Sequence, residues 1–162
     1  MERPWADVTV ADVCERADVA PRTFYRYFTD KSDLFFSDAV RHEGAVTTAV
    51  ARHPFDPHDP WTFAEAVFAE VAPEIEGNGR GAFARRMEIV ASDPDLVARD
   101  LLKRHRLESV VVAQLVTVVP PTTARVWAGV FVAVLFAAVA DWASGDQPMA
   151  SHVHRAIAAI RG

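Results

Sequence analysis

Cysteine, lysine and long apolar runs are all scarce in this sequence. A single cysteine, Cys14, excludes a disulfide framework and a cysteine-based zinc site, and is typical of proteins in a reducing compartment. Lys31 and Lys103 are the only lysines among 17 basic residues, which are outnumbered by 22 acidic ones. The net charge of −5 argues against a protein coated in nucleic acid, although a small local DNA-binding face is compatible with it.

No segment has the length and composition expected of a membrane span. The longest uncharged apolar run covers residues 126–140, and its fifteen residues fall short of the roughly 18–20 that cross a bilayer. The N-terminus lacks the apolar segment that a signal peptide requires. We therefore expect no membrane partner and a cytoplasmic protein. The length of 162 residues is enough for one or two small domains with a sizeable core.

Apolar residues recur with helical spacing along the chain, and no stretch alternates as a strand would. Proline, glycine and capping residues divide this pattern into about eight helices, which predicts an all-α fold. Thr9 is a plausible cap for the first helix, Pro21 opens the second, and Asp30 caps a third that runs to about His53. Further helices are expected from Pro60, around residues 83–91, from Pro94 to about Val119, from Thr122 to about Ser144, and after a turn at residues 145–148.

Two short helices separated by a tight break and followed by a third suit a helix-turn-helix, whose second helix enters the DNA major groove. Phe24 and Phe28 share one face of the second helix and would anchor it to its own domain. The outward side chains would present guanidinium and hydroxyl donors to DNA: Arg22, Thr23, Tyr25, Arg26 and Tyr27. Lys31 adds a charge at the start of the third helix, a position suited to phosphate. The pattern alone is equally compatible with a solvated charged helix packed by two aromatic rings.

The order of residues in this segment is distinctive. Thr9-Val10 opens the first helix, Ala17-Asp18-Val19 forms the break, and the pattern Thr-Phe-Tyr-x-Tyr-Phe-x-x-Lys-x-x-Leu runs from Thr23 to Leu34. This run closely resembles the helix-turn-helix signature of TetR-family transcriptional repressors. Two positions depart from the pattern. Asp18 replaces the usual glycine, which is tolerable because aspartate visits the left-handed region more readily than most residues, and Ala20 replaces the usual serine cap.

The resemblance implies a TetR-like fold, with a DNA-binding head at residues 1–36 and a ligand-binding and dimerisation domain at residues 37–162. It implies phosphate contacts for Thr9, Thr23, Tyr27 and Lys31, contacts to base edges or the groove floor for Pro21, Arg22 and Tyr25, and either role for Arg26. It also implies a repressor that binds a pseudopalindromic DNA operator as a homodimer and is released by a small apolar or amphipathic effector.

In a regulator of this type, side chains of the second domain would line an effector cavity. The candidates are Trp61, Phe68, Phe83, Met87, His105, Gln114, Trp127 and Phe131. Each aromatic or sulfur-containing residue among them is more simply explained as part of the hydrophobic core.

The sequence gives little support to a metal site or to catalysis. His152 and His154 are two residues apart and so lie on different faces of a helix, and no His-x-x-x-His or Glu-x-x-His pair is present. Motifs of a serine nucleophile or a phosphate-binding loop are also missing. We expect no metal, no cofactor and no enzymatic activity. The open alternatives are a helical ligand-binding or scaffold protein that no longer binds DNA, and an enzyme on a helical bundle.

The last two helices are expected to form the dimer interface. Residues 126–140 are too apolar to face water on any side, and the final helix carries Val153, Ile157 and Ile160 on one stripe. Two such helices from each chain would form an intermolecular four-helix bundle, with close approach at Ala133, Ala137 and Ala138. The alternative is that residues 126–140 form the centre of a monomer core.

Heads of the TetR type begin with an amphipathic helix that packs across the two reading helices, yet only eight residues precede Thr9. Residues 1–36 also hold five basic against seven acidic residues, which is unfavourable for approaching DNA. We therefore expect that this chain starts too late. On this hypothesis, the 162-residue form binds its operator poorly while still dimerising and holding ligand.

Overall fold

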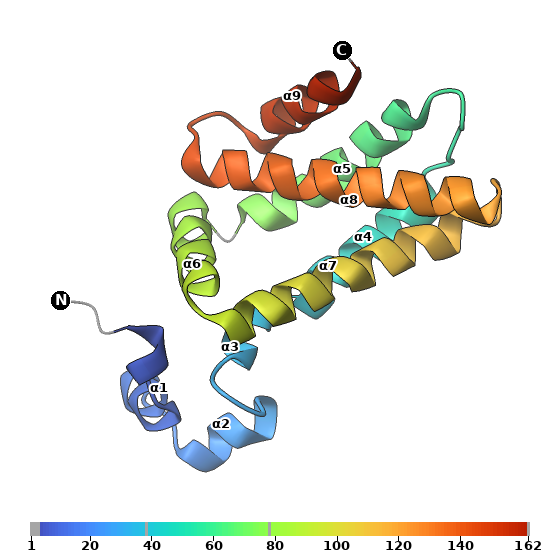
Figure 1. Cartoon of the computed structure of the whole chain (residues 1–162). Coiled ribbons are helices and arrows are strands. Elements are labelled where there is room, and N and C mark those ends of the chain that lie inside the picture. The colour runs from blue at the N-terminus through green and yellow to red at the C-terminus, as the bar shows by residue number, and fades with distance from the viewer. Residues whose placement is uncertain (1–3, 38, 78, 162) are drawn as a thin grey trace.

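The computed structural model describes residues 4–37, 39–77 and 79–161, and all of their regular structure is helical. The N-terminal part contains a short 3₁₀ helix, η1 (Trp5–Asp7), followed by α1 (Val10–Ala17), α2 (Pro21–Tyr27), α3 (Asp33–Phe36) and α4 (Ala39–Arg52). The bundle continues with α5 (Pro60–Glu76), α6 (Arg80–Ser92), α7 (Pro94–Leu115), α8 (Pro121–Ser144) and α9 (Met149–Arg161). Helices α1 and α2 project from one end of the bundle (Figure 1). The predicted all-α fold is confirmed.

The ends of α1 and α2 follow from side-chain chemistry. Thr9 Oγ1 accepts a hydrogen bond from Asp12 N at 3.2 Å, and Asp12 Oδ2 accepts one from Thr9 N at 2.7 Å, so the two residues form a capping box. Asp18 ends α1 in the left-handed conformation, with φ of 53°. Pro21 occupies the first turn of α2, and Ala20 provides no side-chain cap. The predicted cap at Thr9, break at Asp18 and start at Pro21 are confirmed.

The prediction of one helix from Asp30 to His53 is wrong, because the structure has two helices, α3 and α4, in this range. Asp30 does cap the turn before α3, where its Oδ1 accepts from Ser32 N at 2.8 Å and Asp33 N at 3.1 Å. The two helices pack against different neighbours. Phe35 of α3 meets the Trp5 ring edge-on at 4.4 Å, whereas Val50 of α4 is buried in the core of the bundle. A continuous apolar pattern does not reveal this change of partner.

Helix α8 crosses the centre of the bundle and packs along α7, α6 and α9. The sequence predicted no segment of this kind, but α8 is the one helix within the described residues that is long and apolar enough to cross a membrane, because it continues past Arg125 and Asp141 on both sides of the uncharged run. Of its most apolar stretch, 44% is buried inside the fold. Val153 and Ile157 of α9 are also buried in their own chain, with 4% and 2% of their surface exposed. The prediction that they face a partner is therefore wrong, because both complete the core against α5 and α8. Ala138 is buried for the same reason.

The end of α5 and the start of α6 hold the turn between α8 and α9 in place. Glu76 Oε1 accepts a hydrogen bond from Met149 N at 2.8 Å, at the start of α9. Arg80 donates to the carbonyl oxygens of Gly145 and Gln147, and its guanidinium lies 5.4 Å from the Trp142 ring centre. These contacts fix the loop that orients α9.

Candidate nucleic-acid interface

Helix α2 is fixed to the head by one aromatic side chain. Phe24 is 4% exposed, and its ring centre lies 5.2 Å from that of Phe28. Cys14, on the facing helix α1, is 3% exposed. Because Phe24 points inward, residues on the opposite side of α2 must point outward. The sequence predicted that Phe24 and Phe28 anchor this helix; Phe24 is buried as expected, whereas Phe28 follows the last residue of α2 and is only half-buried.

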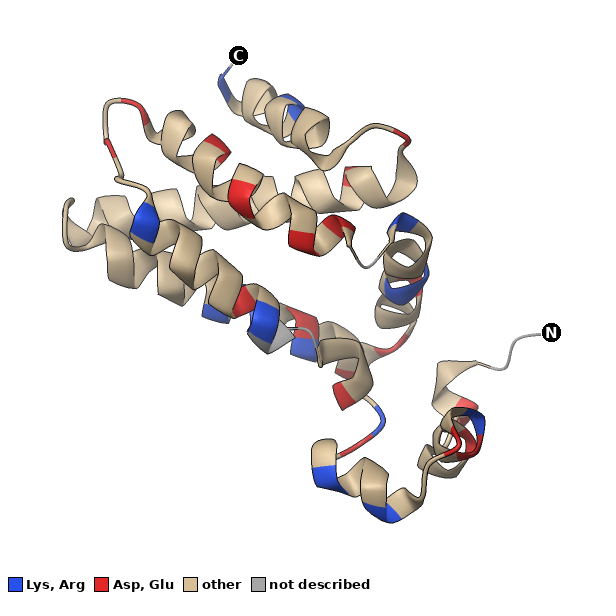
Figure 2. Ribbon diagram, turned by 180° about the vertical axis from the view of Figure 1, so that it is seen from behind, with Lys and Arg blue, Asp and Glu red and all other residues tan. Residues whose placement is uncertain are grey.

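The outward side of α2 is basic and aromatic. Tyr25 and Tyr27 are 59% and 67% exposed, and Arg22 and Arg26 are also exposed. Figure 2 shows Lys and Arg positions along α2 at the outer end of the head, whereas α1 carries more acidic than basic positions. Helix α2 contains no acidic residue, so its exposed side can approach an anion without internal repulsion.

Two of the exposed residues form a pair. The Nη2 atom of Arg26 donates to the Tyr27 hydroxyl at 2.8 Å, and the guanidinium lies 4.7 Å from the centre of the Tyr27 ring. A guanidinium has five N–H donors, so Arg26 keeps further donors besides the one used by Tyr27. Pro21 is exposed at the start of the same helix, and Thr23 is half-buried.

Thr9 and Lys31 make contacts within the head in place of the expected phosphate contacts; the sequence predicted the cap at Thr9 but not the partners of Lys31. The Thr9 hydroxyl is part of the capping box described above. The ammonium of Lys31 donates to three carbonyl oxygens, at 2.8 Å to Trp5, 3.1 Å to Ala6 and 2.6 Å to Val8. An ammonium has three donors, so in this conformation Lys31 directs them all to the backbone around η1. Carbonyl oxygens carry no sequence signal, and their approach to Lys31 was therefore missed.

Another basic residue, Arg99, connects the head to the bundle. Arg99 of α7 donates from Nη1 to Asp33 Oδ1 at 2.7 Å and from Nη2 to Asp30 Oδ2 at 2.5 Å. Partial burial would raise the pKa of Asp33, but hydrogen bonds from Thr29 N and Arg99 outweigh it, and the pKa is lowered. The hydrogen bond with Asp30 contributes most to raising the pKa of Arg99. No sequence pattern predicts this bridge, because Asp33 and Asp30 lie 66 and 69 residues away from Arg99 along the chain.

An open groove of about 790 Å³ lies beside this bridge, between head and bundle. Its walls come from α2, from α3 and the residue after it, from α4 and from α7. The lining residues are Tyr27, Phe28, Asp33, Phe36, Ser37, Glu43, Arg99, Leu102, Lys103 and Arg106.

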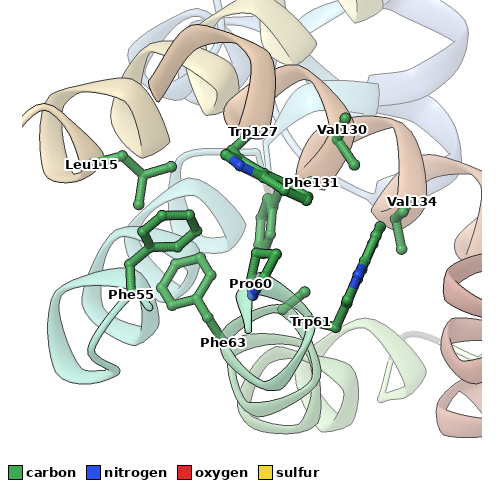
Figure 3. Close-up of a pocket in the computed structure, with 10 residues that line it drawn as sticks. Phe55, Pro60, Trp61, Phe63, Leu115, Trp127, Val130, Phe131 and Val134 are labelled. Atoms are coloured by element: carbon green, nitrogen blue, oxygen red, sulfur yellow. The ribbon is translucent and has the colours of Figure 1, made fainter. Parts of the chain in front are cut away.

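The candidate effector residues are distributed over several places. Trp61, Trp127 and Phe131 meet at one end of the bundle, with the two indole rings edge-to-face at 5.4 Å (Figure 3). Phe68 stacks on Phe131 at 4.4 Å and is 1% exposed. Together with Phe55, Phe63 and their neighbours, these rings nearly fill the space between them.

Phe83 lines a different cavity of about 50 Å³, which is partly open to solvent and is called the inner cavity below. The other residues around it are His42, Val46, Val71, Ile75, Lys103, Leu107, Leu135, Phe136 and Val139. Met87 is half-buried on α6 and lines neither place, and His105 is exposed on α7. Gln114 is exposed beside a shallow surface groove near His53. The structure therefore does not bring the eight candidates into one cavity. Within the described residues, no three His, Cys, Asp or Glu side chains are placed together to hold a metal ion.

A basic, outward-facing second helix, anchored by a buried phenylalanine and carried at one end of a helical bundle, defines the class of helix-turn-helix DNA-binding proteins. Residues 1–37 match the family model described as bacterial regulatory proteins, tetR family. The chain is a DNA-binding transcriptional regulator with the head of the TetR family, and the bundle from residue 38 onward lies outside the match. A comparison with curated proteins gave no match.

Proposed function

We propose that the chain is an effector-controlled repressor that acts in the cytoplasm and binds a pseudopalindromic operator as a homodimer. The observation that carries this proposal is the outward side of α2, where Arg22, Tyr25, Arg26 and Tyr27 are exposed around a helix fixed by Phe24. An arginine at the start of a recognition helix is suited to bidentate contact with guanine in the major groove. We place the head at residues 1–36 and the ligand-binding and dimerisation domain at residues 37–162.

In this proposal Arg22 and Tyr25 contact base edges, and Pro21 lies against the groove floor. Tyr27 and Thr23 offer hydroxyl groups to phosphates, and Arg26, stacked on Tyr27, serves either purpose. For Thr9 and Lys31 the hydrogen bonds within the head favour a positioning role, in which they hold the backbone around η1 and the start of α1.

Selection of sequences from a random duplex pool by the full chain tests this function. We expect an enriched two-fold symmetric site, bound with low affinity because residues 1–36 hold more acidic than basic residues, and with an affinity that falls steeply as salt rises. Arg22→Ala should cost about 1–3 kcal/mol at one base position and relax the preference there. Arg125→Ala, at the exposed start of α8, is the control and should leave affinity and preference unchanged. Failure to enrich any sequence would favour the rival function, a helical ligand-binding protein without DNA binding.

For the effector we propose the inner cavity lined by Phe83, His42 and Lys103. Its walls are mostly apolar with a few polar groups, as is typical of small-molecule sites. The volume of about 50 Å³ is smaller than the roughly 300–1,000 Å³ of such sites, so an effector must push the surrounding helices apart. A ligand that requires this widening favours a different conformer of the bundle, which is the property a controlling effector needs.

A further inference from the structure

Arginine side chains connect the head to the bundle. Helices α1 and α2 pack on each other, and the other closely packed helix pairs of the described chain join α4 and the later helices among themselves. Two arginines of the bundle make side-chain contacts with the segment that follows α2. Arg99 of α7 bridges Asp30 and Asp33, and the guanidinium of Arg86 of α6 lies 5.6 Å from the Phe36 ring centre. Figure 1 shows the head reaching the bundle through the narrow region of α3.

The two carboxylates that Arg99 contacts are themselves held in place. Asp30 also accepts hydrogen bonds from Ser32 N and Asp33 N, and Asp33 accepts one from Thr29 N at 2.7 Å. These bonds fix both carboxylates to the turn that follows α2. A guanidinium presents its N–H groups in a rigid fork, so two fixed carboxylates define its orientation more closely than one could. The bridge therefore restrains the angle between the reading helix and α7 as well as their distance.

Helix α7 also forms a wall of the inner cavity. Lys103, one turn after Arg99, lines both the groove beside the bridge and the cavity, and Leu107, one turn further, lines the cavity and is 3% exposed. An effector that widens the cavity displaces these side chains or the helix that carries them. Because a helix moves as a rigid element over two turns, a displacement of the α7 backbone at Lys103 and Leu107 also displaces Arg99.

We propose that Arg99 is a positioning residue, through which the bundle sets the orientation of the DNA-reading helix and cavity widening acts on the head. This inference rests on the proposed function for its DNA and effector, but the bridge itself can be tested without either. In a dimer, the two reading helices must lie about 34 Å apart to enter successive major grooves, and a head freed from Arg99 no longer holds that spacing.

The first experiment measures the distance between head and bundle. Spin labels are attached through Arg16→Cys on α1 and Ser109→Cys on α7, in a Cys14→Ser background, and labelled protein is diluted with unlabelled protein so that distances within one chain are read. We expect a narrow distribution for the otherwise unchanged protein and a broad one for Arg99→Gln. Arg106→Gln is the matched control, because Arg106 lies on α7 and lines the same groove without an ion pair in the described structure. Circular dichroism of each variant establishes that its helices are retained.

The second experiment measures affinity for the sequence selected by the wild-type chain. Arg99→Gln should weaken binding about tenfold or more, since apparent affinity falls in proportion to the fraction of heads in the competent orientation. Arg99→Lys should recover part of the loss, because an ammonium can pair with one of the two carboxylates. Asp33→Asn removes the charge from the other side while its amide oxygen can still accept from Thr29 N. Combined with Arg99→Gln, it should add little further loss.

An unchanged distance distribution in Arg99→Gln would overturn the proposal, as would equal broadening in Arg106→Gln. A broadened distribution with unchanged operator affinity would also overturn it, because orientation would then not matter for binding. If the wild-type chain selects no DNA sequence, the proposed function fails, and the distance measurement still decides whether Arg99 holds the head.

Discussion

At the scale of single residues, Lys31 has two possible uses for its charge, and they predict different salt dependences. In the structure its ammonium donates to the carbonyls of Trp5, Ala6 and Val8. Replacing it by methionine keeps the aliphatic stem but removes three charge-assisted hydrogen bonds. We expect Lys31→Met to weaken operator binding by loosening η1, without changing the slope of log affinity against log salt. A phosphate contact would instead reduce that slope by about one.

Gly145 gives a second prediction at this scale. An added Cβ would lie 2.8 Å from His152 Cε1 and 2.9 Å from the Asp141 carbonyl oxygen. His152 is 2% exposed and cannot move aside, so Gly145→Ala should lower the free energy of unfolding by about 1–3 kcal/mol. Gly81→Ala on α6 is the matched control, because nothing lies within 4 Å of its added Cβ. It should be neutral or stabilise the helix by up to about 1 kcal/mol, as measured by chemical denaturation.

Residue chemistry explains how much of the site was predictable. Local caps such as Thr9 and the break at Asp18 depend on neighbours within a few residues, and the sequence predicted both correctly. The outward side of α2 followed from helical spacing around Phe24. The partners of Lys31 and Arg99 were not predictable, because they lie 23 to 69 residues away along the chain. Their acceptors are backbone carbonyls and aspartate carboxylates, which occur throughout the sequence and do not mark a particular partner.

At the scale of elements, the turn between α2 and α3 carries a pH-dependent prediction. The folded-state pKa of Asp33 lies below its ordinary value, so its ionised form stabilises the fold above the unfolded pKa, and this contribution is lost as pH falls through the folded pKa. The head-to-bundle distance distribution should therefore stay narrow from neutral pH to about 5 and broaden below about 4. Asp33→Asn should show a distribution with a weaker pH dependence. Broadening that begins between pH 6 and 7 would point to a histidine instead.

The positions of the helices were easier to predict from the sequence than the surfaces against which they pack. Proline and aspartate at the starts of α5 and α7 marked those helices correctly, because both residue types favour the first turn. The division between α3 and α4 was missed because Phe35 and Val50 look alike in a hydrophobic pattern, although one packs on Trp5 and the other in the bundle. For α9, the apolar stripe was correctly located, but Val153 and Ile157 face their own chain.

At the scale of the whole molecule, α8 leaves an apolar stripe on the surface that supports the proposed dimer. Val126 is 59% exposed, and Ala133, Ala137 and Ala140 are exposed on the same helix at spacings of seven, four and three residues. These positions recur on one side of a helix, and small side chains allow close approach of a second helix. Ile160 of α9 is 52% exposed and can contribute at the edge.

We expect the unchanged chain to be a dimer at micromolar concentration and Ala137→Arg to be a monomer, as measured by sedimentation equilibrium. A long charged side chain in the middle of the stripe would be buried without a partner. Ala98→Arg, at an exposed position of α7, controls for the added charge and should remain a dimer. A monomeric wild-type chain would show that the stripe has another purpose.

The narrow connection between head and bundle also bears on how such a regulator can be recombined. The reading helix, its aromatic anchor and both acidic partners of Arg99 all lie within residues 21–33, whereas the bundle supplies Arg99 itself. A grafted head with different base contacts would therefore need to keep Asp30 and Asp33 to be held by this bundle. Specificity for DNA and responsiveness to a ligand can then be exchanged separately, as long as the head keeps its two carboxylates and the bundle its arginine.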